Sequence, residues 1–195
     1  MKLLVDASSS LLFSLILAQL PFLTSALPLN HKRGPDLEKL TNQTRHLLKL
    51  TQELRKDHVV GEVEHILKSL PTMTSKTSDL SSLQLKTTLP QLLFDLQSFE
   101  LHLEWLSRAS RKHRHTASPN LAKLGDLIVH TKTISASLQR QMLKVDALRL
   151  PTPTPSLPPL PEVWNLVQCS REILDQFSLF LDWASRALLT LKSKI

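Results

Sequence analysis

Three residues near the end of the chain have the types and spacing to recognise another molecule. Asp182, Arg186 and Leu189 follow one another at intervals of four and three, which places them on one stripe of a helix. A carboxylate and a guanidinium four residues apart can form an ion pair worth about 0.3–0.5 kcal/mol. An arginine beside an exposed apolar residue is also typical of protein–protein contact sites. The stripe therefore predicts either a solvated ion pair or a surface that binds a partner protein.

A dense basic run, RASRKHRH at 108–115, is the second candidate for chemistry. On a chain with a net charge of +7, this run could bind heparan sulfate or another polyanion. A solvated loop is the simpler interpretation of the same residues. No aromatic side chains are interleaved with the basic ones, so nucleic acid is not an expected partner. The candidate heparin-binding residues are Arg108, Arg111, Lys112 and Arg114.

Motifs for catalysis are absent from the sequence. There is no glycine-rich phosphate loop, no nucleophile elbow and no HExxH motif. The eight histidines are scattered, apart from His113 and His115, and the cations around these two disfavour a divalent metal. We therefore expect no enzyme activity, no cofactor and no metal site.

The composition indicates which elements must position these residues. Leucine dominates the apolar content, and the 195 residues include three glycines and no tyrosine, which favours an all-α fold. The single cysteine, Cys169, cannot form an internal disulfide, and a domain of about 170 residues can fold without one. We interpret Cys169 as a small buried apolar residue, with intermolecular pairing as the alternative.

The first residues resemble a secretory leader. An apolar run, Leu11–Leu23, is too short for a comfortable membrane span and is followed by the small residues TSA at 24–26. We expect a signal peptide at 1–26 and a secreted domain at 27–195, without membrane insertion; an N-terminal membrane anchor is the alternative. Asn42 begins the sequon NQT, so it is a candidate for glycosylation.

Four amphipathic segments are predicted as helices, at about 35–58, 90–107, 118–148 and 161–195. Pro35, Pro90 and the pair Ser118-Pro119 are read as helix starts. Two long connections, Val59–Leu89 and Pro151–Pro161, can each return the chain along the bundle, whereas Arg108–Ala117 is shorter. This pattern favours an up-up-down-down long-chain four-helix bundle without disulfides.

The last segment has one buried stripe and an opposite, outward face. Asp182, Arg186 and Leu189 fall on the outward face, and Trp164 does too, although Trp164 could instead be core beneath the proline-rich connection. The expected core stripe consists of Leu166, Ser170, Ile173, Phe177, Leu181, Ala184, Leu188 and Leu191.

Several stretches carry a resemblance to a known family. LDWASRALLTLK at 181–192, SLPT at 69–72, LQL at 83–85, EWLSRA at 104–109 and the proline-rich segment before Trp164 resemble the interleukin-11 family. This family belongs to the interleukin-6-type long-chain four-helix cytokines, and the resemblance covers most of the chain after residue 26. The absence of a cysteine pair agrees with it.

The resemblance implies three receptor-binding sites. Asp182 and Arg186 match positions that bind the interleukin-11 receptor α chain, with Leu189 beside them. Trp164 matches the centre of a site for the shared receptor glycoprotein 130. The loop residues matching that same site are Thr74, Ser75, Lys76 and Thr77. A further site lies on the first and third helices, without residue assignments.

The implied mechanism is assembly of receptors and not catalysis. A monomeric cytokine would bind its α chain, recruit glycoprotein 130 and trigger JAK–STAT signalling. Three rivals remain open at this stage: a secreted helical lipid carrier, a heparin-binding protein that uses the run at 108–115, and a related cytokine with another α chain.

Overall fold

The computed structural model describes residues 35–56, 67–72, 77–112, 121–159 and 163–195, with the backbone alone for residues 77, 78, 163 and 164. Within these ranges the chain forms four α-helices and no strand, so the all-α prediction is confirmed. The expected signal segment, 1–26, lies outside the described residues. The elements are α2 (Leu37–Lys56), η2, a 3₁₀ helix (Thr77–Ser82), α3 (Leu85–Lys112), α4 (Leu121–Lys144) and α5 (Val163–Ser193).

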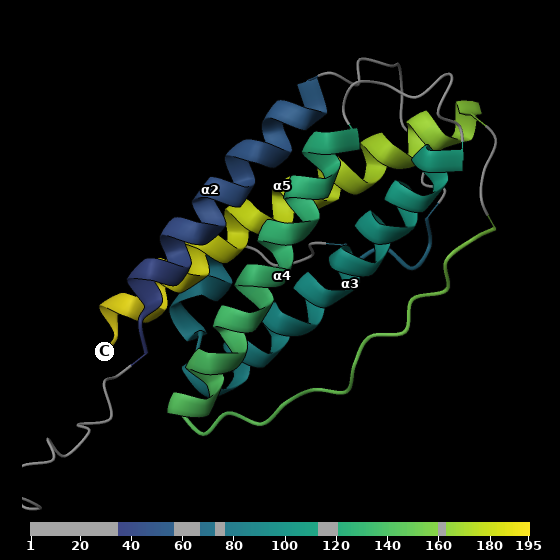
Figure 1. Ribbon diagram of the computed structural model, residues 1–195. Coiled ribbons are helices and arrows are strands. Elements are labelled where there is room, and N and C mark those ends of the chain that lie inside the picture. Colours follow the sequence, from purple (N-terminus) through teal and green to yellow (C-terminus); the bar gives the residue numbers. More distant parts are fainter. Residues whose placement is uncertain (1–34, 57–66, 73–76, 113–120, 160–162) are drawn as a thin grey trace, which may run out of the picture. The chain divides into compact units, whose positions relative to one another are not determined.

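The helices are arranged as an up-up-down-down bundle. α2 packs on α5 and α4, and α3 packs on α4 and α5; among the described residues, α2 and α3 are not in contact. Figure 1 shows α2 and α3 running in one direction and α4 and α5 running back. A meander of successive neighbours would place α2 beside α3, so the predicted topology with two long crossovers is confirmed.

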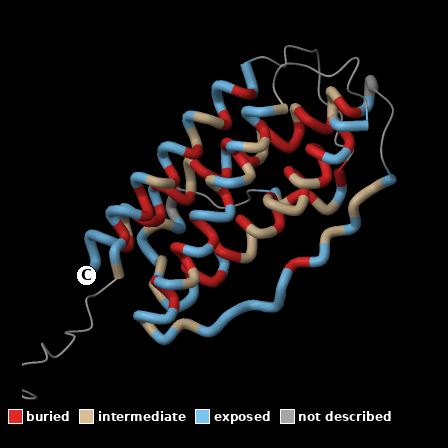
Figure 2. The backbone as a smooth tube through the Cα atoms, in the orientation of Figure 1, coloured by how far each residue is buried: buried red, intermediate tan, exposed pale blue. Residues whose placement is uncertain are grey.

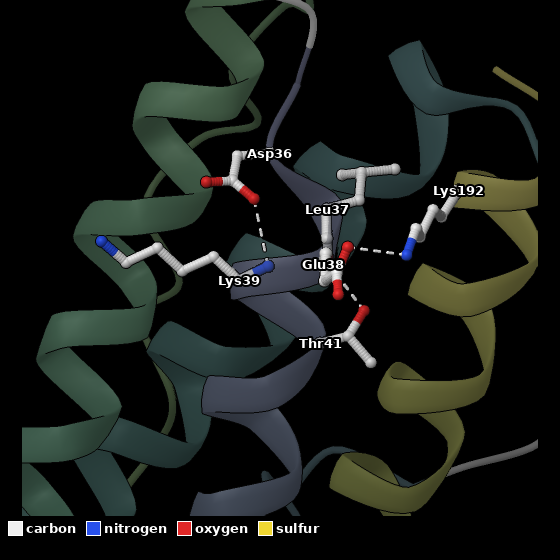
Figure 3. Close-up of polar contacts among 6 residues, drawn as sticks. All are labelled: Asp36, Leu37, Glu38, Lys39, Thr41 and Lys192. Carbon is white, nitrogen blue, oxygen red and sulfur yellow. Dashed lines mark hydrogen bonds and ion pairs between the residues drawn. The ribbon is translucent and has the colours of Figure 1, made fainter.

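Polar contacts fix the start of α2 against the ends of α4 and α5. The backbone nitrogen of Lys39 donates to Asp36 Oδ1 at 3.1 Å, which makes Asp36 the N-cap (Figure 3). The nitrogen of Asp36 donates to Gln141 Oε1 at 2.7 Å, and Lys192 pairs with Glu38 at 2.9 Å. The prediction that Pro35 is the first residue of this helix is therefore wrong. Asp36 is the N-cap, and α2 begins at Leu37, two residues after Pro35.

The core lies along the shared axis of the helices, where buried positions face inward (Figure 2). Its centre is aromatic: Phe99 of α3 lies 5.0 Å from Phe177 and 5.2 Å from Phe180 of α5, between ring centroids. Every position of the expected α5 core stripe is buried, which confirms that prediction.

The buried face of α2 mixes leucines with threonines. The hydroxyls of Thr41, Thr44 and Thr51 each donate to the carbonyl oxygen four residues earlier, at 2.7 to 2.9 Å. These side chains therefore satisfy their polar atoms within α2 and present methyl groups to the core.

Three predicted helix boundaries are wrong. α3 begins at Leu85 and ends at Lys112, so Pro90 lies inside the helix and Arg108 belongs to the helix and not to the loop. Burial explains both extensions, because Leu89 and Ala109 are fully buried. α4 ends at Lys144, four residues before the predicted end at 148. Two residues after the helix, Asp146 adopts a positive φ of 51°, which is not helical. The expected start at Ser118-Pro119 lies outside the described residues.

The segments between helices pack along α3. The segment 145–159, called here the second crossover, runs beside α3 in Figure 1. Its Pro158 carbonyl oxygen accepts a 3.0 Å hydrogen bond from Trp105 Nε1 of α3. The described parts of the first crossover, between α2 and α3, are residues 67–72 and residues 77–84, which include η2.

Candidate functional site

The outward stripe of α5 is solvent-exposed. Arg186 Nη2 lies 2.8 Å from Asp182 Oδ2, and these side chains are 54% and 47% exposed. Leu189, one turn further on, is 39% exposed. Because both ionic partners are about half in water, their pair contributes only a few tenths of a kcal/mol. The stripe thus contributes little to the fold and leaves most guanidinium N–H groups of Arg186 open to another acceptor.

Part of the first crossover lies beside the C-terminal end of α5, close to the exposed stripe. η2 contacts α5, and Lys194 Nζ donates to the carbonyl oxygens of Ser81 at 2.6 Å and Leu83 at 2.9 Å. These bonds hold η2 beside the last turns of α5. The structure therefore brings the α5 stripe and the end of the first crossover to one end of the bundle.

Of the residues expected at the shared-receptor site, the structure describes only the backbone of Thr77 and Trp164. Thr74, Ser75 and Lys76 lie outside the described residues, and so do the side chains of Thr77 and Trp164. The backbone of Thr77 begins η2, near the C-terminal end of α5, whereas Trp164 lies in the first turn of α5. α5 is about 45 Å long at 1.5 Å per residue, so Thr77 and Trp164 lie towards opposite ends of it.

The basic run is partly helical. Arg108, Arg111 and Lys112 are exposed on the last turns of α3, while Arg114 lies outside the described residues. Cations at a helix C-terminus interact favourably with the helix dipole, which gives Arg111 and Lys112 a local structural role. Their exposure also leaves them accessible to a polyanion.

Asn42 is exposed on α2, where it borders a hollow of about 730 Å³ between α2 and α4. Across this hollow the rings of His46 and His130 meet edge to face, with centroids 5.2 Å apart. A glycan on Asn42 would therefore stand over the surface shared by α2 and α4.

A buried polar group lies under the first crossover. Glu172 of α5 is buried and accepts a 3.2 Å bond from the Leu67 nitrogen. Burial, and then the Glu172 charge, raise the pKa of Cys169 to about 11, so its thiol stays protonated, as expected of a buried apolar residue.

His102 of α3 is a second buried titratable residue. Its Nδ1 lies 2.8 Å from the Ser98 carbonyl oxygen, and burial lowers the pKa of its imidazole.

An ion-pair cluster around Asp175 of α5 was not predicted from the sequence. Asp175 accepts from Arg55 of α2 at 3.1 Å and lies 3.6 Å from Arg171. The spacing of Arg171 and Asp175 is a visible signal, because residues four apart on a helix are neighbours. Arg55 comes from another helix, so its part in the cluster depends on the packing of α2 against α5.

Metal-binding clusters and membrane-spanning helices were sought in the described residues. In the described ranges, no three histidine, cysteine, aspartate or glutamate side chains group as a metal site. None of the helices described there is long and apolar enough to cross a membrane.

A family model and several known proteins are similar to this chain, and they point to the same family. The family described as Interleukin 11 matches residues 28–195 of the chain. The chain is 33% identical over 168 residues to interleukin-11 of Mus musculus and 34% identical over 172 residues to that of Macaca fascicularis. It is 34% identical over 168 residues to interleukin-11 of Homo sapiens. Each of these matches covers 82% of this chain and 81% of the relative.

Proposed function

The chain belongs to the interleukin 11 family of cytokines, and from that membership we propose that it binds the interleukin-11 receptor α chain and then recruits glycoprotein 130. Members of this family are cytokines and not enzymes, so the chain acts by binding. The proposal includes secretion after removal of residues 1–26, a monomer before receptor assembly, and JAK–STAT signalling after it.

The exposed stripe on α5 is the main support for the proposed contact with the receptor α chain. Arg186 is more than half exposed although its carboxylate partner Asp182 is only 2.8 Å away. A guanidinium has five N–H donors in a rigid fork, so it can keep Asp182 and bind a receptor carboxylate or carbonyl oxygen as well. Leu189 supplies apolar area beside it, and η2 lies close to the same end of α5.

For glycoprotein 130 we propose two contacts. Trp164, in the first turn of α5, is the centre of one, with Thr74, Ser75 and Lys76 as candidate neighbours. The position of η2 favours assigning Thr77 to the α-chain end instead. The hollow between α2 and α4, which Asn42 borders, is the candidate surface for the other contact.

The test of the α-chain contact is surface binding of residues 27–195 to the receptor α ectodomain, with the interleukin-6 receptor as a selectivity control. We expect Arg186→Ala to weaken binding by about 2 kcal/mol, or about thirtyfold, with an unchanged melting temperature. Arg140→Ala, at an exposed arginine of α4, is the matched control and should bind as wild type. Wild-type affinity in Arg186→Ala would remove that residue from the site, and no binding by folded wild type would reject the proposal.

Heparan sulfate is a second candidate ligand, favoured by the exposure of Arg108, Arg111 and Lys112 on one end of α3. Replacing all three with alanine should lower the salt concentration that elutes the protein from heparin, because each lost cation removes counterion release. A lipid carrier is not favoured. The described hollow among the core residues, which Leu92 and Phe180 line, measures about 10 Å³, too small for an acyl chain.

A further inference from the structure

A second surface hollow lies where the two crossovers meet the middle of α3. Its volume is about 410 Å³, within the range of small-ligand sites. The described lining comes from the first crossover, from α3 and from the second crossover. These residues are Ser69, Pro71, Thr72, Phe94, Asp95, Ser98, Pro153, Thr154 and Pro155, and we call the hollow the crossover pocket.

Hydrogen bonds hold the walls of the crossover pocket in place. The Ser69 hydroxyl donates to the Ser156 carbonyl oxygen at 2.9 Å, which ties the first crossover to the second. The same hydroxyl lies 3.2 Å from Nε2 of His102, whose ring is fully buried in α3. Trp105 Nε1 holds Pro158 a few residues further along the second crossover. The pocket is therefore framed by three segments that are bonded to one another.

The lining of the crossover pocket combines one acid with hydroxyl side chains and apolar rings. Asp95 is the charged residue of the described lining. Its carboxylate accepts one 2.9 Å bond, from Gln91 Nε2, and has no ion pair in the described part of the chain. Burial raises the pKa of Asp95, and the Gln91 bond offsets part of that rise. The sequence has a net charge of +7, yet its described residues place no cation in an ion pair with this half-buried carboxylate.

We propose that the crossover pocket binds a guanidinium or ammonium group carried on an apolar stem, with Asp95 as its anionic partner. A cation would compensate the partly desolvated carboxylate, and a guanidinium can do so through two parallel hydrogen bonds. The half-buried ring of Phe94 and the prolines 71, 153 and 155 offer apolar surface to the stem. None of these residues belongs to the α5 stripe, so the proposal is independent of α-chain binding.

The test compares two small probes of the same shape, n-butylguanidinium and neutral n-butylurea, by titration of the amide resonances. The expected result is a saturable shift at Ser69, Phe94 and Ser98 with n-butylguanidinium alone. Asp95→Asn should weaken this binding at least tenfold. The variant keeps a side-chain oxygen that can accept the Gln91 bond, and an unchanged melting temperature would verify its fold. Asp126→Asn, at an exposed aspartate of α4, makes the same charge change elsewhere and should bind as wild type.

A second arm identifies the source of the cation. The capped tripeptide acetyl-Gly-Arg-Gly-amide is compared with its neutral citrulline analogue. Charge-dependent peptide binding would support a protein-borne arginine, and binding of n-butylguanidinium alone would support a free small guanidinium compound. The proposal is overturned by equal binding of n-butylurea, by undiminished binding in Asp95→Asn, or by the absence of a saturable shift at these three residues.

Discussion

The Ser69 hydroxyl lies between His102 Nε2, 3.2 Å away, and the Ser156 carbonyl oxygen, 2.9 Å away. A hydroxyl has one proton, so if Ser69 donates it to Ser156, His102 must donate from Nε2. Nδ1 of His102 also faces an acceptor, the Ser98 carbonyl oxygen. A neutral imidazole carries one N–H and the charged form carries two. The contact between the crossovers is therefore linked to the proton count of His102.

The first prediction concerns acid stability. Burial lowers the pKa of His102 below its ordinary 6.5, against smaller opposing effects of the Ser98 bond and the Glu172 charge. The unfolded chain thus takes up this proton at higher pH than the folded chain does. The His102 contribution to stability is present above pH 6.5 and is lost as pH falls through 6.5 towards the folded pKa.

Urea unfolding of wild type and His102→Gln at several pH values between 7.5 and 5 tests this prediction. The glutamine has an NH2 donor group and a carbonyl acceptor. Because it does not titrate between pH 7.5 and 5, the variant should lose less stability on acidification than wild type. A wild type that gains stability relative to His102→Gln at low pH would contradict it. That result would show that the charged imidazole, with both N–H groups bonded, outweighs the penalty of burial.

Trp105→Phe tests how the second crossover is held. The substitution keeps an aromatic ring in a buried position and removes the donor to Pro158. We expect a loss of about 1–2 kcal/mol in the free energy of unfolding, the scale of one hydrogen bond and an unpaired carbonyl. Hydrogen exchange at the centre of α3 should stay as slow as in wild type. Wild-type stability in the variant would show that this bond does not hold the crossover.

The sequence predicted the helices well because their buried stripes are long and regular, as in the α5 stripe from Leu166 to Leu191. It predicted the α3 boundaries poorly. Pro90 is a local signal for a helix start, and the basic residues after Ser107 are a signal for a helix end, but burial of Leu89 and Ala109 outweighs both. Local propensity is a weak guide where tertiary packing rewards another turn of helix.

Lys194→Ala tests whether η2 belongs to the α-chain site. The lysine holds the Ser81 and Leu83 carbonyl oxygens, so its loss should free η2 from the end of α5. We expect α-receptor binding to weaken several-fold with a small change in melting temperature, because the contact is exposed. Lys192→Ala is the matched control, since it removes a neighbouring cation that pairs with Glu38 instead. Equal effects of the two variants on binding would indicate a loss of net charge alone.

Trp164→Ala separates the two receptor contacts. We expect the variant to keep α-receptor binding, because Trp164 lies in the first turn of α5, far along the helix from Arg186. STAT phosphorylation in responsive cells should be lost. A fall of many degrees in melting temperature would instead identify Trp164 as a core residue beneath the proline-rich segment.

The candidate site was predictable in part. The spacing of Asp182, Arg186 and Leu189 fixes them to one face of a helix, and the core stripe on the other side fixes that face outward. The position of η2 depends on Lys194, and the crossover pocket depends on Ser69 meeting Ser156, 87 residues away. Contacts between segments so distant in sequence leave no periodic signal in either one.

The threonines on the buried face of α2 have a consequence for temperature. Because each hydroxyl bonds within its own helix, separating α2 from its neighbours would break no threonine hydrogen bond. Beyond its start, where Asp36 bonds to Gln141 and Glu38 pairs with Lys192, α2 is held by apolar burial. Exposed ion pairs such as Arg55–Asp175 add to this attachment. Hydrophobic burial weakens on cooling. The attachment of α2 should therefore loosen in the cold sooner than contacts secured by buried hydrogen bonds, such as that of Leu67 to Glu172.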